Sequence, residues 1–598
     1  MRGFSRWIIF CLAGLAFFAP LKFGTPVISE PALIPPNSVE GWIYFTWPQQ
    51  IATIFAFGAL LWLVLDGERL AARMDLLFVL PLIFLGTQIL ATPASIAPQT
   101  SMDTLLSFAV NVLLFYAAAW YVRDGATAAR IFGALGIATM LVMVFALEQY
   151  FGGLQKTREF AALQHLPPEF IARLESNRVF GSLVYPNALA GFLVLAFAPT
   201  LAWIWARSRS WIVWMKWATL VFAGGLMLFC LALTGSRGGF VAFAAMIAAG
   251  LSCFALKRSR RIGWILAALL AVAAFFVLAH RTGLITLKTG SVVARSDYWR
   301  GAVAIALDHP WLGTGPGTFG SIYPKYKNNA TEETQLVHNN FLQMASDSGM
   351  IAFLVFALLW LVALRDAFQL ARQRPGDAAA IAICAAVAGW IVHSLLDFDL
   401  YVPGVAMPAF LLMGILQGLK ETPATEPAPL PYRHRAAMGI LCALAVVCIV
   451  RTEGRSFRAA LAHGRALELA PYAPGRALIE IREAIALAPR TALYHSLAGD
   501  LSLALDQVTE ATEHYRAATE SDPYRASYHW RLARALDSRG QSTAALEQFQ
   551  RAQELNPGNT RYLQDLAAAK ESVRQPDPHL LESVPATQRE LDSSAATR

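Results

Sequence analysis

The stretch Leu336-Val337-His338-Asn339-Asn340-Phe341-Leu342 closes a polar and aromatic insertion that runs from about Arg281 to Ser346 between hydrophobic segments. A loop of this length in a compact protein is usually functional or disordered. This one carries helix-like and turn-like order, including the turn Gly313-Thr314-Gly315-Pro316-Gly317. Its Arg, Tyr, Trp, Asn and His side chains suit phosphate and sugar recognition, and His can accept a proton near neutral pH. We therefore interpret the insertion as the working part of the chain.

The composition excludes a soluble globular chain of this length. Of 598 residues, 56% are hydrophobic and only 15% are charged, and the mean hydropathy is +0.45. The net charge of +8 comes mainly from short basic clusters between apolar runs, which is typical of a polytopic membrane protein, so we expect no nucleic-acid partner. The six cysteines lie in or beside apolar runs. Their spacing implies neither a disulfide framework nor a zinc site.

Apolar runs long enough to cross a membrane as helices recur along the chain. We expect about 13 of them, near residues 7–23, 48–65, 75–92, 103–121, 130–151, 183–206, 211–234, 238–256, 261–280, 347–364, 378–396, 403–419 and 436–451. The first run follows Arg2 and Arg6 as in a signal peptide, but no clean small-residue cleavage site precedes Pro20. We therefore interpret it as an anchor. The predicted fold class is an all-α, polytopic helical membrane protein.

The basic residues between these runs predict the orientation of the chain. With the N-terminus in the cytoplasm, every basic cluster falls on the cytoplasmic side. These clusters are Arg69 and Arg73; Arg123 and Arg130; Arg207, Arg209 and Lys216; Lys257-Arg258-Ser259-Arg260-Arg261; Arg365, Arg372 and Arg374; and Lys420, Arg433 and Arg435. The extracytoplasmic side then receives the loop 152–182, the long insertion and everything after the last span.

Beyond the last span the sequence becomes polar and repeats with a period of 34 residues. The positions that keep this period are Pro489, Pro523 and Pro557; Tyr494, Tyr528 and Tyr562; and Ala484, Ala518 and Ala552. This period, with small residues in the second helix and a proline at its end, is typical of tetratricopeptide repeats. Unrelated amphipathic helices would not keep three sets of positions in step. We divide the chain into a transmembrane domain (1–452, including the insertion 281–346), a tetratricopeptide α-solenoid (455–573) and a disordered polar tail (574–598).

Four polar groups meet on the extracytoplasmic face in this topology, and two of them centre on arginine. The first is Asn177-Arg178-Val179-Phe180-Gly181-Ser182 with Tyr185-Pro186-Asn187-Ala188-Leu189-Ala190-Gly191. Arg178 stands there near a helix N-terminus, whose free amides favour a phosphate, or it snorkels toward lipid headgroups. The second is Thr234-Gly235-Ser236-Arg237-Gly238-Gly239. Its arginine marks a functional site, or pairs structurally with a carboxylate such as Asp397.

The other two groups contain histidines. His338 is followed by Asn339 and Asn340 at the entry to the tenth span. This group is either catalytic or a solvated histidine beside an asparagine that caps the next helix. The last group is His393-Ser394-Leu395-Leu396-Asp397-Phe398-Asp399, between the eleventh and twelfth spans. It is either a charge network that supports the site or an ordinary polar corner.

Taken together, these motifs resemble those of the bacterial O-antigen ligase, O-antigen polymerase and O-oligosaccharyltransferase superfamily. The resemblance covers roughly residues 40–420 and rests on the stretch from Arg178 to Ala190, the Thr-Gly-Ser-Arg-Gly turn, the insertion closed by Val-His-Asn-Asn and the His-Ser-x-x-Asp-Phe-Asp corner. It implies a GT-C-like glycosyltransferase fold with functional roles for Arg178, Arg237 and His338. Tetratricopeptide extensions also occur in this superfamily. The motifs do not separate its members.

The resemblance further implies a donor glycan on undecaprenyl diphosphate, used at the periplasmic face of the inner membrane, and a lipid, glycan or protein acceptor. Arg178 and Arg237 would stabilise charge on the leaving diphosphate, and His338 would take the proton of the acceptor hydroxyl. Additional substrate-binding residues are expected to be Arg295, Arg300, Asn339, Asn187, His393 and Asp397. We expect no cofactor and no metal, since this face carries no acidic pair with metal-ligand spacing apart from Asp397 and Asp399.

Several functions are compatible with this sequence. A ligase would pass a finished glycan to its acceptor, a polymerase would extend a chain on the same lipid carrier, and an O-oligosaccharyltransferase would modify a protein. A periplasmic scaffold or a flippase-like lipid transporter is the non-enzymatic alternative. The tetratricopeptide domain would bind an extended partner on its concave surface.

Overall fold

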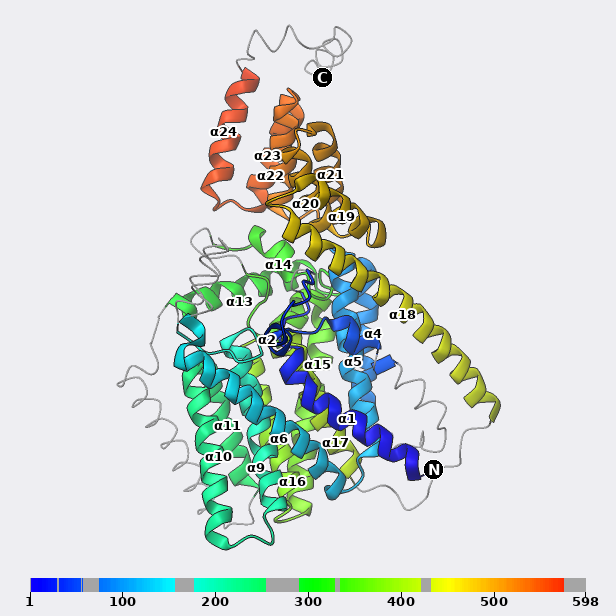
Figure 1. The fold of residues 1–598 in the computed structure, drawn as a ribbon, viewed down its shortest axis with the longest axis vertical. Helices are drawn as coiled ribbons and strands as arrows, with labels where there is room; N and C mark the ends of the chain where they lie inside the picture. The colour runs from blue at the N-terminus through cyan, green and yellow to red at the C-terminus, as the bar shows by residue number, and fades with distance from the viewer. Residues whose placement is uncertain are drawn as a thin grey trace. The chain divides into compact units, whose positions relative to one another are not determined.

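The computed structural model describes residues 2–28, 32–54, 56–57, 75–155, 177–253, 290–328, 334–420 and 432–574, and it contains no strand in these ranges. Figure 1 shows the course of the chain. The chain divides into two compact units. Unit 1 comprises Met1–Ser29, Pro35–Phe319 and Leu336–Phe457, and unit 2 comprises Glu30–Ile34, Gly320–Gln335 and Arg458–Arg598.

Unit 1 is a bundle of apolar helices. Its helices are α1 (Arg2–Lys22), α2 (Val39–Tyr44), α4 (Leu76–Ala91), α5 (Pro98–Tyr121), α6 (Gly125–Glu148), α9 (Pro186–Arg207), α10 (Val213–Leu233), α11 (Arg237–Ser252), α13 (Gly290–Asp308), α15 (Asn340–Gln373), α16 (Ala378–Ser394) and α17 (Pro403–Leu419). Short helical turns are η1 (Thr92–Ala94), η2 (Gln149–Gly153) and η4 (Asp399–Tyr401). The helix α18 (Tyr432–Leu469) begins in unit 1 and continues in unit 2.

Among the described residues, six helical segments are long and apolar enough to cross a membrane. They are Leu76–Ala94, Pro98–Tyr121, Gly125–Gly153, Pro186–Arg207, Val213–Leu233 and Asn340–Gln373. The shorter apolar helices are Trp7–Lys22, Arg237–Ser252, Ala378–Ser394 and Pro403–Leu419. These segments support a multi-pass membrane protein, but the predicted count of about 13 spans is not confirmed. The predicted run at 261–280 and half of the run at 48–65 lie outside the described residues.

Small residues let the central helices of unit 1 approach closely. The pairs α11 with α16, α16 with α9, and α17 with α5 pack against each other. A Cβ added at Gly389 of α16 would lie 2.6 Å from a side-chain atom of Val194 on α9, and one at Gly414 of α17 would lie 2.3 Å from the carbonyl oxygen of Phe115 on α5. Because apolar lipid gives no hydrophobic drive for helix association, such close backbone contact supplies much of the attraction.

Part of the insertion folds onto the start of α15. The turn after α13 meets a kink at Gly349, where φ is +87°. The amide of Met350 donates a hydrogen bond to the carbonyl of Pro310 at 2.8 Å, and a Cβ at Gly349 would lie 2.3 Å from the carbonyl oxygen of Trp311. The rest of the insertion includes α14 (Phe319–Ile322) and η3 (Tyr323–Lys325), while residues 281–289 and 329–333 lie outside the described ranges.

In the described part of unit 2, the six helices that follow α18 pack in sequence order, each against the next. They are α19 (Pro474–Leu487), α20 (Ala492–Ala504), α21 (Val508–Ser521), α22 (Ala526–Ser538), α23 (Ser542–Leu555) and α24 (Thr560–Arg574). Alternate helices begin 34 residues apart, as the positions of Pro474, Val508 and Ser542 show. Their assignment as tetratricopeptide repeats stays a prediction. The predicted domain boundary near residue 455 falls inside α18, and the tail after Arg574 lies outside the described residues.

A buried ion-pair cluster joins the ends of three helices in unit 1. The Lys420 ammonium contacts the carboxylate of Asp75 at 2.7 Å and also pairs with Asp366, whose side chain is 4% exposed. Arg365 is the second cation on Asp366, at 2.7 Å. Removing one cation from a buried carboxylate is costly because the remaining charge is left undercompensated.

We expect Lys420→Met to lower the free energy of unfolding by about 3 kcal/mol, since Asp366 would lose a buried partner. Thermal unfolding of the purified protein in one detergent measures this change. Arg209→Met, at an exposed position, is the matched control and should leave the unfolding temperature nearly unchanged. Equal unfolding temperatures for both variants would contradict a stabilising role of the cluster.

Candidate functional site

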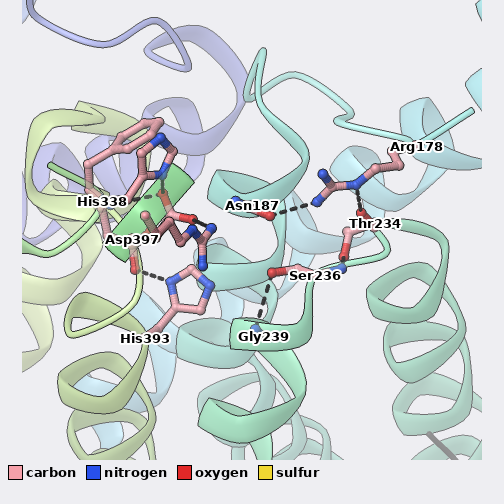
Figure 2. Close-up of polar contacts among 11 residues, drawn as sticks. Arg178, Asn187, Thr234, Ser236, Gly239, His338, His393 and Asp397 are labelled. Atoms are coloured by element: carbon pink, nitrogen blue, oxygen red, sulfur yellow. Dashed lines mark hydrogen bonds and ion pairs between the residues drawn. The ribbon is translucent and has the colours of Figure 1, made fainter. Parts of the chain in front are cut away.

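Four polar groups gather at the end of unit 1 where α9, α11 and α15 begin and α16 ends. The electrostatic environment of Arg178 includes Asp397, Arg295 and Arg237, and that of Asp397 includes His338 and Arg295. Figure 2 shows His338, Asp397 and His393 grouped together, with Arg178 beside Asn187 and Thr234. The structure therefore brings most of the residues named from the sequence to the same end of the bundle.

Arg178 is fixed between two segments that are far apart in the sequence. Its Nε donates to the carbonyl of Thr234 at 2.6 Å, and its Nη2 donates to Oδ1 of Asn187 at 2.6 Å (Figure 2). Gly235 has φ +60°, and a Cβ there would lie 3.3 Å from the Arg178 Nε. These contacts hold the guanidinium inside the protein and do not leave it to snorkel toward lipid.

The charge of Arg178 is set by a crowded environment. Burial lowers the pKa of its guanidinium, and the charges of Arg295 and Arg237 lower it further, against the opposing effect of Asp397. An arginine remains protonated under such conditions because its ordinary pKa lies far above neutral pH. The cluster thus concentrates positive charge, which makes it a suitable site for an anion.

Arg237 is the first residue of α11. Ser236 caps this helix, and its Oγ accepts a hydrogen bond from the amide of Gly239 at 3.2 Å (Figure 2). The tight turn before the cap places Arg237 beside the free amide groups of the first helical turn. The charge of Arg237 and the amide groups at the start of α11 both favour a negatively charged ligand.

Asp397 is a buried carboxylate held between the guanidinium of Arg295 and the imidazole of His338. Its Oδ2 contacts Nη2 of Arg295 at 3.2 Å, and its Oδ1 lies 3.3 Å from Nδ1 of His338. The amide of Phe398 also donates to Oδ1, at 2.9 Å. Burial alone would raise the pKa of the Asp397 carboxyl, but His338 and Arg295 outweigh it and hold this pKa well below its usual range.

His338 is oriented by its backbone and by two aromatic rings. Its φ is +56°, an unusual conformation for a side-chain-bearing residue. Its ring stacks on Tyr298 with a centroid distance of 5.9 Å and meets Phe398 edge-on at 4.7 Å. The side chain keeps 23% exposure, so the ring is fixed but accessible.

His393 forms an interior pair with Asp399. Its Nδ1 lies 2.6 Å from Oδ2 of Asp399, and the two side chains are 0% and 1% exposed. A Cβ at Gly191 of α9 would lie 2.6 Å from the Asp399 oxygens, so the carboxylate is packed against that helix. Burial raises the pKa of Asp399, against the opposing effect of His393. Because the His393 side chain is fully buried, we interpret it as a support for the site and not as a direct contact of the substrate.

Two residues predicted to bind substrate have other contacts in the structure. Arg300 pairs with Asp297 on its own helix at 2.6 Å, and its side chain is 59% exposed. Asn339 caps α15, and its Oδ1 accepts from the amides of Phe341 at 3.0 Å and Leu342 at 3.1 Å. The structure therefore does not bring Arg300 into the cluster, and it gives Asn339 the capping role that the sequence left as an alternative.

The sequence motifs contain further residues of the site region whose contacts they did not predict. Asn340 is fully buried, and neither polar atom of its side chain has a hydrogen-bond partner among the described residues. Tyr298 and Phe398 frame the histidine, and Asp399 partners His393. A buried carboxylate, Asp347, lies where the sequence predicts the first residue of an apolar span, so hydropathy concealed it. Within the described ranges, no group of three His, Cys, Asp or Glu side chains is placed to hold a metal ion.

Fold and site together define a multi-pass helical membrane protein with a cationic, histidine-containing cluster at one end of its bundle. Residues 222–357 match the family model described as O-antigen ligase. This segment includes Arg237, Arg295 and His338, whereas Arg178 and Asp397 lie outside it. The match supports the O-antigen ligase superfamily and, in general terms, glycan transfer between a lipid-linked glycan and an acceptor in a membrane. A comparison with curated proteins found no match.

We expect Asp397→Asn to lower the unfolding temperature, because Arg295 and His338 would lose their shared carboxylate. The pKa of Asp397 is lower in the folded than in the unfolded protein, so its stabilisation is complete above the unfolded value and is lost as pH falls through the folded value. The stability gap between wild type and variant should therefore stay constant from neutral pH down to about pH 4 and narrow below it. Thermal unfolding across pH measures this gap. A gap that closes between pH 7 and pH 5 would contradict the ion-pair assignment.

Proposed function

We propose that this protein transfers a glycan from an undecaprenyl-diphosphate-linked donor to an acceptor hydroxyl at the periplasmic face of the bacterial inner membrane. The observation that carries the proposal is that the charges of Arg237, Arg295 and Asp397 all act on Arg178, while Asp397 contacts Arg295 and His338 directly. In this proposal the N-terminus is cytoplasmic, and the repeats of unit 2 are periplasmic and bind a protein or polymer partner.

The charge balance of the cluster suits a diphosphate. Asp397 offsets the charge of Arg295, whereas the hydrogen bonds of Arg178 to Thr234 and Asn187 go to neutral oxygens. The guanidinium of Arg178 therefore keeps its positive charge for a ligand, and the charge of Arg237 would add to it. In the reaction, the bond between the anomeric carbon of the donor sugar and the diphosphate oxygen breaks, and its electron pair stays with the diphosphate. Fixed guanidinium groups stabilise that developing charge through charge-assisted hydrogen bonds. The transfer needs no metal ion for this step.

His338 supplies the general base. With a proton on Nδ1 facing Asp397, the lone pair of Nε2 can accept the proton of the acceptor hydroxyl as the new bond to the anomeric carbon forms. The contacts with Tyr298 and Phe398 hold the ring in one orientation. A fixed general base contributes about 10²- to 10⁴-fold to the rate.

The two faces of α13 support a donor that arrives on a lipid. Arg295 and Tyr298 lie on the face of α13 that borders the cluster. The opposite face and the following turn expose Leu307 at 70% and Trp311 at 73%. The hydrogen bond between Met350 and Pro310 joins this region to the exposed apolar stripe of α15, which consists of Met350, Ile351, Leu354, Leu358 and Leu361. Because that stripe belongs to a segment apolar enough to cross a membrane, a hydrocarbon chain lying along it would bring its diphosphate toward Arg295.

We expect His338→Ala to lower glycan transfer by about 10²- to 10⁴-fold and Arg237→Lys to lower it strongly, since Lys cannot form the bidentate contact. Glycan profiles of membranes from a deletion strain complemented at matched expression measure this effect. Arg300→Lys, outside the cluster, is the matched control for Arg237→Lys and should restore the wild-type profile. Accumulated single-repeat precursor would indicate a polymerase, and full-length unattached polymer would indicate a ligase. Wild-type profiles from both site variants would refute the proposed site and favour a scaffold.

We expect Leu307→Lys to raise the KM for the full-length lipid-linked donor roughly tenfold with little change in kcat, because about 1.5 kcal/mol of apolar contact is lost. Initial rates with purified protein in nanodiscs measure both constants. Ser296→Lys, at an exposed position of the same helix, is the control for added charge. A donor analogue with a truncated prenyl chain should not distinguish Leu307→Lys from wild type, and an unchanged KM for the full-length donor would refute the role of this face.

A further inference from the structure

Asp347 of α15 is fully buried, and its carboxylate accepts four hydrogen bonds. Oδ2 accepts from the amide of Gly317 at 2.8 Å, from Nε2 of Gln343 at 2.9 Å and from the hydroxyl of Tyr401 at 2.7 Å. Oδ1 accepts from the amide of Phe319 at 3.1 Å. A carboxylate with four donors is well satisfied without a cation, so its role follows from the segments that these donors belong to.

The first of these segments leads to His338. Gln343 donates to Asp347 through its Nε2, and its Oε1 accepts from the amide of Val337 at 2.7 Å. Val337 directly precedes His338, whose φ of +56° is costly for a residue with a side chain. Such a conformation persists only where the surrounding contacts fix it. The Asp347–Gln343–Val337 chain of hydrogen bonds is one such contact.

The second segment leads to Asp397. Tyr401 ends η4, and its amide donates to the carbonyl of Phe398 at 2.9 Å. The hydroxyl bond to Asp347 therefore ties the short corner that carries Asp397 and Phe398 to α15. Asp399, in the same corner, is held from the other side by His393 at 2.6 Å. The corner is thus anchored on both α15 and α16.

The third segment is the glycine-rich turn of the insertion. Besides the bonds from Gly317 and Phe319, the amide of Gly315 donates to the backbone carbonyl of Asp347 at 2.7 Å. Gly313 has φ +64°, and a Cβ there would lie 2.3 Å from the backbone of Asp347. The turn therefore docks directly on this part of α15, and α13, which carries Arg295, lies just before it in the sequence.

We propose that Asp347 is a positioning residue that sets the 3.3 Å separation of His338 and Asp397 while having a hydrogen bond to neither. The inference rests on the proposed function, because it assigns this separation a role in general-base catalysis. One carboxylate holds both sides of the contact, through Gln343 on one side and Tyr401 on the other. A displacement of about 1 Å at a reacting group can lower the rate roughly 100-fold.

The test is a double-mutant cycle on transfer by the purified full-length protein. We expect Asp347→Asn to lower kcat at least tenfold with the donor KM nearly unchanged, since an amide would direct N–H groups at backbone N–H donors. In the Asp397→Asn background, Asp347→Asn should lower kcat little further. The contact between His338 and Asp397 that Asp347 positions is already lost in that background. Tyr401→Phe removes one of the four bonds and should give a smaller loss of kcat with the same coupling, even where Asp347→Asn fails to fold.

Asp366→Asn is the matched control, because Asp366 is also a buried carboxylate of α15 but pairs with Lys420 and Arg365. Its effect on kcat should be small and should add independently to that of Asp397→Asn. If the losses of kcat from Asp347→Asn and Tyr401→Phe multiply with the loss from Asp397→Asn, the positioning role is overturned. Full activity of His338→Ala and Asp397→Asn would overturn the proposed function and this inference together. If His338→Ala and Asp397→Asn impair transfer while Asp347→Asn and Tyr401→Phe remain fully active, the inference alone is overturned.

Discussion

The buried Asp397 carboxylate and its two partners determine how the site is assembled. A carboxylate in the protein interior is costly unless it is paired and hydrogen-bonded. Its partners, Arg295 and His338, both lie in the long insertion, one near the beginning and one at the end. Burying Asp397 is costly unless Arg295 and His338 contact it. The docking of the insertion is therefore coupled to the packing of α16 and η4. The cationic cluster forms only when these parts are together.

Much of the fold and the site could be predicted because both depend on strong local signals. Long apolar runs predicted the helices of unit 1, and a charge beside an apolar run identified Arg178, Arg237 and His338. The partners of these residues could not be predicted, since they come from contacts distant in sequence. Arg178 bonds to a backbone carbonyl at Thr234, which leaves no side-chain signal. Arg300 resembled Arg295 in sequence, but it lies five residues later on α13 and has an exposed side chain.

Asp347 illustrates a different limit of sequence analysis. An acidic residue at the start of an apolar segment is normally interpreted as the edge of a membrane span. Here α15 begins at Asn340, so this carboxylate lies two turns inside the helix and is satisfied by Gln343 of the same helix and by donors from two other segments. Only the spatial arrangement of Gly317, Gln343 and Tyr401 distinguishes such a residue from an ordinary interfacial charge.

The kink at Gly349 gives α15 two mechanically separate parts. The part before the kink carries Gln343 and Asp347 and borders His338, whereas the part after it carries the exposed apolar stripe. A change in bilayer thickness acts on the second part, where tilt relieves hydrophobic mismatch at modest cost. Because Gly349 packs against the backbone of Trp311 and the amide of Met350 bonds to Pro310, the insertion braces the helix at this kink. The two parts of one helix therefore meet different surroundings, and their sequences are subject to different constraints.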